Sequence, residues 1–241
     1  NTTTLSLAVS ILNVNKDILL QGFNSITGGN KSNTPVVNHS TGTLTLGGNI
    51  AAIGQRSTGA TYTMATGSNN GVLKLTSVTP AFTLNSSNPT GTVTFNVNLN
   101  GTSTTVNYSG STNQTIAINY QSSKNKSSAA TTTNLSFRNL TVSGGGNKTF
   151  GGALTITSDL TIDTLTTLIP NAAYTNSIGN VNLNGGTLVS GSTTGFNATY
   201  GTLTLLKSSN INLGTSVHTL NFSASNAITW AAGAMLTVNG W

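Results

Sequence analysis

The chain has 241 residues, of which 36% are hydrophobic and only 5% are charged, against about 25% charged residues in an ordinary soluble domain. The nine basic residues that produce the net charge of +6 are scattered, so the gathered basic face of a nucleic-acid-binding protein is not predicted. Cysteine is absent, which excludes disulfides and thiolate metal sites, and no stretch has the roughly 20 apolar residues that membrane insertion requires.

Strands are predicted wherever apolar and small polar residues alternate over a few positions between Gly, Asn and Ser. In chain order the clearest such segments are 43–46, 71–75, 92–99, 115–118, 135–137, 154–156, 181–183, 202–205, 211–213 and 236–238. Turn signals rich in Gly and Asn separate them, for example at 144–147 and 184–186. No segment has a sustained helical period, so we expect an all-β protein with almost no helix.

Two β-repeat sections are expected, an N-terminal section at 1–120 and a C-terminal section at 134–241 that is continuous with the first. Between them, 121–133 lacks apolar alternation, and we interpret it as an exposed loop or a boundary. The C-terminal section is the more repetitive. Variants of an x-Leu-Thr-β pattern occur there at 139–142, 153–156 and 159–162. Their unequal spacing predicts coils of unequal length.

Short strands at this spacing fit either a parallel β-helix, also called a β-solenoid, or tandem Ig-like β-sandwiches. The low charge favours the solenoid. Equivalent positions in successive coils stack about 4.8 Å apart, where like charges would repel each other, whereas Asn, Ser and Thr can form hydrogen-bonded ladders. A sandwich has no such reason to avoid charge on its solvent face, and it remains the alternative.

Several segments of the second half carry a family resemblance. They are Val-Asn-Tyr-Ser-Gly at 106–110, Gln-Thr-Ile-Ala at 114–117, Phe-Arg-Asn-Leu-Thr-Val-Ser at 137–143, Asn-Lys-Thr-Phe-Gly-Gly at 147–152, the repeats at 153–162, Ile-Thr-Trp at 228–230 and Leu-Thr-Val-Asn-Gly-Trp at 236–241. Together they resemble the β-strand-repeat surface proteins of Bacteroidota. The resemblance covers roughly the last 150 residues, and the first 90 or so match only in style.

This resemblance implies export through the type IX secretion machinery and an extracellular or outer-surface location, as for adhesin-like proteins. Because the sequence opens at Asn1 without Met, we interpret it as a processed chain or an excised fragment. Thr164, in Asp-Thr-Leu at 163–165, fits the O-glycosylation signal of that phylum. A plain strand end is the other interpretation of Thr164.

Few residues are available for catalysis, because Glu is absent and the carboxylates are Asp17, Asp159 and Asp163. Glycosidases need two carboxyls about 5 to 9.5 Å apart, whereas Asp159 and Asp163 on one straight strand would be about 13 Å apart unless a turn intervened. His39 and His218 lack neighbouring ligands for a zinc site, and we expect both to be surface or turn residues. We therefore predict no enzyme, no catalytic or metal-binding residue and no cofactor.

The last candidates are aromatic residues near the C-terminus. Trp230 and Trp241 could contact a ligand such as a carbohydrate, or cap a solenoid end. The function that we predict is an extracellular structural or adhesive β-solenoid segment with a glycan or protein partner outside the cell. The alternative is a module that binds ice or glycan on one face of the solenoid.

Overall fold

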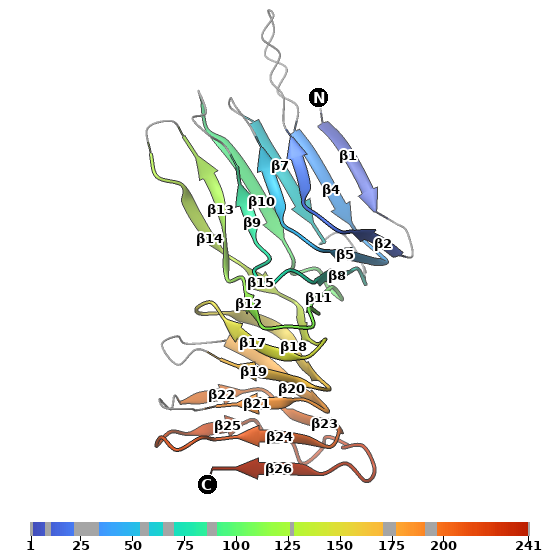
Figure 1. Ribbon diagram of the computed structural model, residues 1–241, viewed down its shortest axis with the longest axis vertical. Coiled ribbons are helices and arrows are strands. Elements are labelled where there is room, and N and C mark those ends of the chain that lie inside the picture. Colours follow the sequence, from blue (N-terminus) through green and yellow to red (C-terminus); the bar gives the residue numbers. More distant parts are fainter. Residues whose placement is uncertain are drawn as a thin grey trace, which may run out of the picture. The chain divides into compact units, whose positions relative to one another are not determined.

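In a computed structural model, residues 2–7, 11–21, 34–53, 58–64, 70–85, 91–125, 128–170, 177–190 and 197–240 are described (Figure 1). Within these ranges every regular element is a strand and none is a helix, which confirms the all-β prediction. The chain divides into two compact units. The first contains Asn1–Thr104 and Asn119–Leu135, and the second contains Thr105–Ile118 and Ser136–Trp241.

The first unit is built mainly of parallel ladders. Its strands are β1 (Thr2–Leu7), β2 (Ile11–Val14), β3 (Ile18–Gln21), β4 (Thr34–His39), β5 (Thr43–Leu46), β6 (Ile50–Ile53), β7 (Thr58–Thr63), β8 (Val72–Leu75), β9 (Phe82–Leu84), β10 (Val93–Asn98), β13 (Asn119–Lys124) and β14 (Thr131–Asn134). The ladders are β1-β4-β7-β10, β2-β5-β8 and β3-β6-β9. Each ladder joins every third strand of the chain.

One part of this unit departs from the parallel pattern. β13 pairs antiparallel with both β10 and β14. The segment 121–133, which we expected to be an exposed loop or a boundary, therefore lies largely within a β-hairpin. Its outer strand β14 is exposed along its whole length, as a run of Thr and Asn without apolar alternation allows.

The second unit repeats the parallel arrangement. Its strands are β11 (Thr105–Tyr108), β12 (Gln114–Ile116), β15 (Ser136–Phe137), β16 (Asn139–Val142), β17 (Gly146–Phe150), β18 (Thr155–Asp163), β19 (Thr166–Ile169), β20 (Ser177–Asn184), β21 (Thr187–Val189), β22 (Ala198–Tyr200), β23 (Leu203–Lys207), β24 (Ser209–Asn212), β25 (Leu220–Phe222) and β26 (Leu236–Asn239). Three ladders contain most of them: β11-β16-β18-β20-β23, β12-β17-β19-β21-β24-β26 and β22-β25.

Register keeps like residues together along these ladders. The inward column of the first ladder is Val106, Leu140, Leu160, Val181 and Leu203, all of them buried. The neighbouring outward column is Asn107, Thr141, Thr161, Asn182 and Thr204, all partly exposed. Side chains alternate between the two faces of a strand, and in-register parallel pairing keeps each face the same from strand to strand. Ig-like sandwiches are built of antiparallel sheets, so they do not describe these ladders.

Candidate functional site

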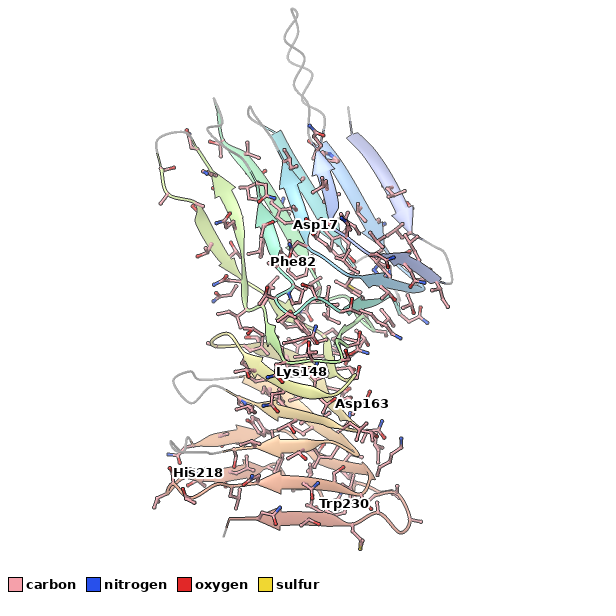
Figure 2. The ribbon with its side chains drawn as sticks, viewed as in Figure 1. Asp17, Phe82, Lys148, Asp163, His218 and Trp230 are labelled. Carbon is pink, nitrogen blue, oxygen red and sulfur yellow. The ribbon has the colours of Figure 1, made fainter. Side chains whose placement is uncertain are left out.

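The most unusual interior side chain is Lys148 on β17, labelled in Figure 2. It lies in register between Gln114 and Leu168 in an inward-facing column, and it has no exposed surface. Its Nζ donates hydrogen bonds to the Gly110 carbonyl at 2.6 Å and the Thr112 carbonyl at 2.9 Å. Burial lowers the pKa of Lys148 to about 8.

Through these two hydrogen bonds, Lys148 stabilises the turn that precedes β12. Beside it, the Gln114 side chain accepts a hydrogen bond from the Gly110 backbone N–H at 2.9 Å. This role was not predicted from the sequence, in which Lys148 is one of several scattered basic residues. A signal was present, since Lys148 lies two residues before Phe150 and therefore shares the buried face of the same strand.

His39, at the end of β4, is also buried, with 1% of its surface exposed. Its Nε2 lies 3.3 Å from the Gly42 carbonyl, to which it must donate, so Nδ1 accepts a hydrogen bond from the Tyr62 hydroxyl at 3.0 Å. Burial lowers the pKa of His39, and the bond to Gly42 opposes this effect. The expectation that His39 is a surface or turn residue is wrong, because it packs edge-on against Tyr62 in the core.

His218 forms a different pair, with Ser190. The Ser190 Oγ lies 2.8 Å from the His218 Nε2, and the His218 Nδ1 lies 2.7 Å from the Ser216 carbonyl. The carbonyl requires a proton on Nδ1, so Ser190 donates to Nε2. Hydrolases use such a Ser–His pair when the serine faces the substrate. Here Ser190 has no exposed surface and a carbonyl stands where a triad has a carboxylate, so the pair fits a structural bridge between two loops.

Asp159 and Asp163 both lie on β18, in a stretch paired regularly with Asn180 and Asn184 of β20. A strand rise of about 3.3 Å per residue places them about 13 Å apart, and no turn intervenes. Asn180 donates to Asp159 at 3.1 Å, and Asn184 donates to Asp163 at 2.7 Å. The two carboxylates therefore belong to polar ladders and are too far apart to act together as a glycosidase pair.

The third carboxylate, that of Asp17, also has a hydrogen-bond partner. It accepts a hydrogen bond from the Asn49 backbone N–H at 2.6 Å. Within the described ranges, no three His, Cys, Asp or Glu side chains gather closely enough to hold a metal ion. Since the described ranges contain only strands, they include no helix that could span a membrane.

Thr164 and Leu165 form the tight turn between β18 and β19. Thr164 is exposed, and its hydroxyl donates to the Asn184 carbonyl at 3.0 Å. Leu165 adopts a left-handed backbone conformation with a φ of 64° and leaves 84% of its side chain exposed. An enzyme could reach the Thr164 hydroxyl in this turn, and the position is also a strand end, so both interpretations of Thr164 stand.

Trp230 lies against the edge of β23. Its indole N–H donates to the Leu203 carbonyl at 3.1 Å, and the following Ala231 N–H donates to the Leu205 carbonyl at 2.8 Å. This geometry is that of a cap, with 39% of the Trp230 side chain exposed. Trp241, the other aromatic candidate, lies outside the described residues.

A groove of about 850 Å³ opens beside β25 and β26, and we call it the C-terminal groove. Its apolar lining includes Ile211, Leu213, Leu220, Phe222, Leu236 and Val238. Thr215, Ser216, His218 and Thr219 contribute polar groups to it. Its volume falls within the range of small-ligand pockets, about 300 to 1,000 Å³. No signal in the sequence located this groove, because its lining comes from strands of different ladders, β24 and β26 of one and β25 of another.

The fold and these sites define an all-β protein of mostly parallel ladders, with buried polar anchors and an open apolar groove. Comparisons with protein-family models, with curated proteins and with solved structures give no significant match to this chain.

Proposed function

We propose that this chain is a segment of a parallel β-solenoid that serves outside the cell as a structural or adhesive element. The observation that carries the proposal is the in-register parallel pairing of every third strand in the first unit, such as β1-β4-β7-β10. A chain that returns to the same ladder after three strands has the connectivity of a three-sided coil. In such a solenoid each coil is stabilised by its neighbours, and the stack propagates one core.

The mechanism that we propose is mechanical. Outward columns such as Asn107, Thr141, Thr161, Asn182 and Thr204 are neutral, so stacking brings no like charges together. The two described carboxylates of β18 stack on asparagine instead of on another acid. Load applied along the stack would be shared among the backbone hydrogen bonds of all sides of each coil.

The location outside the cell rests on the resemblance to Bacteroidota β-strand-repeat proteins. Surface proteolysis and immunolabelling of intact cells of the source organism would test it, with a strain lacking type IX secretion as the control. We expect labelling of intact wild-type cells and none of the mutant. Detection only after lysis would contradict the proposed location.

Modification of Thr164 is a separate part of this proposal, supported by its exposure in the turn after β18. Mass spectrometry of the protein isolated from its source should find a glycan on the peptide that contains Thr164. The variant Thr164→Ala should lack that mass. An unmodified peptide from the native source would leave Thr164 as a plain strand end.

A second candidate function is ligand binding on the outward face of β17, β19, β21, β24 and β26. One column of this face is Asn147, Thr167, Thr187, Asn210 and Thr237, held in register by successive parallel pairings. Neighbouring strands in a sheet are about 4.8 Å apart, so the column presents hydroxyl and amide groups at a regular spacing. A regular array of this kind could order water at an ice surface or contact a repeating glycan.

Thermal hysteresis and a glycan-binding assay would test this second function. The variant Thr167→Tyr/Thr187→Tyr places bulk on the face and should abolish either activity. The matched control Thr141→Tyr/Thr161→Tyr changes the outward column of the other ladder and should leave it intact. If the wild-type chain shows neither activity, this second function is ruled out and only the structural role remains.

A further inference from the structure

Two segments of this chain have the same local sequence and different surroundings. Val-Asn-Leu-Asn-Gly occurs at 97–101 and again at 181–185, and each copy ends in an Asn-Gly pair. Glycine has no Cβ, so its backbone nitrogen is open to approach by the preceding asparagine side chain. The other two Asn-Gly pairs, at 70–71 and 239–240, adjoin residues outside the described ranges. Because the two segments are identical, a large difference in reactivity between them must come from the structure around them.

We infer that Asn100 is a site of spontaneous deamidation and that Asn184, in the second copy, is protected from it. In this reaction the Gly101 nitrogen gives up its proton to water and attacks the Cγ carbon of the Asn100 side chain. The N–Cγ bond forms, the Cγ–Nδ2 bond breaks, and the amide nitrogen takes up a proton from water and leaves as ammonia. Water then opens the cyclic imide at either of its two carbonyl carbons, which gives aspartate or isoaspartate.

Asn100 lies in the turn between β10 and β11, outside both strands. It is exposed, so water can reach the side-chain amide and ammonia can leave. Gly101 is buried, but the attack is intramolecular and needs only the Asn100 side chain to rotate towards it. Either product carries a carboxylate, which lowers the net charge of +6 by one unit.

Asn184 is held by hydrogen bonds on its side chain and on both of its backbone neighbours. Its Nδ2 donates to the Asp163 Oδ1 at 2.7 Å, and its carbonyl accepts from the Thr164 hydroxyl at 3.0 Å. The N–H of Gly185, which would have to lose its proton, donates to the Ser209 Oγ at 2.9 Å. Asn184 also ends β20, which is paired with β18 on one side and β23 on the other. Ring closure therefore requires these bonds to break and the ladder to open locally.

The product of deamidation would also be unfavourable at position 184. A carboxylate there would lie against the Asp163 Oδ1, which now accepts a hydrogen bond from the Asn184 amide. Two carboxylates in contact repel each other, and one of them would have to take up a proton. The inference goes beyond the proposed function and does not depend on export from the cell.

Peptide mapping by mass spectrometry of the 241-residue chain, incubated at mildly alkaline pH, would follow both asparagines in one sample. We expect deamidation at Asn100 to be at least about tenfold faster than at Asn184, because breaking even one hydrogen bond to a charged group costs about a factor of ten. In urea, where the surroundings are lost, the two identical segments should react at similar rates. Isoaspartate at position 100 would identify the cyclic intermediate.

A substitution beside Asn184 tests the cause of its protection. Ser209→Ala removes the acceptor of the backbone N–H and should accelerate deamidation at Asn184 without changing that at Asn100. The matched control Ser143→Ala removes a hydroxyl that donates to a side chain of β11 instead, and it should change neither rate. Circular dichroism would show that each variant remains folded. If Ser209→Ala does not fold, Thr164→Ala, at an exposed position, takes its place.

Three results would overturn the inference. The folded chain could deamidate equally fast at both positions. Asn100 could keep its amide in the folded chain while both asparagines react in urea. Lastly, Asn184 could stay as slow in the folded variant as in the wild type, which would show that its hydrogen bonds do not protect it.

Discussion

Raising the pH from about 7.5 to about 9.5 should stabilise the folded protein through Lys148. Burial holds the pKa of this amine at about 8 in the folded state, against an ordinary value of 10.5. In this window the unfolded chain keeps the proton that the folded protein has lost, so unfolding takes up a proton and a higher pH opposes it. The linkage amounts to about 2 kcal/mol over the window.

The change of about 2 kcal/mol in the free energy of unfolding is an upper limit, because the hydrogen bonds from Nζ to the Gly110 and Thr112 carbonyls stabilise the ammonium form. The window must stop below about pH 10, where tyrosines begin to contribute. Burial raises the pKa of Tyr62 and Tyr108, and it raises the pKa of Tyr200 to about 12. Above pH 10 unfolding would release protons from these groups, which reverses the sign of the pH dependence.

Urea denaturation followed by circular dichroism at several pH values would measure the effect in the wild type and two variants. Lys148→Met removes the buried amine, and its stability should not show the rise that the wild type shows. Lys74→Met, the same change at a partly exposed position of β8, should follow the wild type. A difference between the wild type and Lys148→Met that stays constant across the window would refute the reasoning.

Three further substitutions test other features. Because the pKa of buried His39 is lowered, the unfolded chain takes up the proton first as the pH falls below about 6.5, and the folded protein loses stability. Melting temperatures at pH 7 and 5 should therefore show a smaller loss of stability for His39→Gln than for the wild type. An equal loss would contradict this reasoning. Leu165→Asn should raise stability by about 0.5 to 1 kcal/mol, because Asn tolerates a positive φ better than Leu, whereas Leu206→Asn should bring no gain. Trp230→Phe removes the hydrogen bond from the indole N–H to the Leu203 carbonyl and should lower the free energy of unfolding, measured by chemical denaturation, by about 1 kcal/mol. Unchanged stability would show that this bond does not hold the edge of β23.

Alternation in the sequence was enough to predict the strands and their two faces. In β16, Leu140 and Val142 are buried and Thr141 is partly exposed, as the alternation of apolar and polar residues indicates. Such predictions succeed because the pleat of a strand has a period of two residues, which is a local property. The wide spacing of Asp159 and Asp163 along one strand was predictable for the same reason.

Tertiary structure alone decided which residues meet across long separations. Lys148 finds carbonyl acceptors in a turn more than 30 residues earlier, and His39 finds Tyr62 on the next strand of its ladder. Coil lengths vary, so spacing in the sequence could not set these registers, nor show that β13 and β14 turn back as a hairpin. The alternation of residues determined what each strand buries, whereas the pairing of distant strands determined which polar groups are buried with it and which apolar edges stay open.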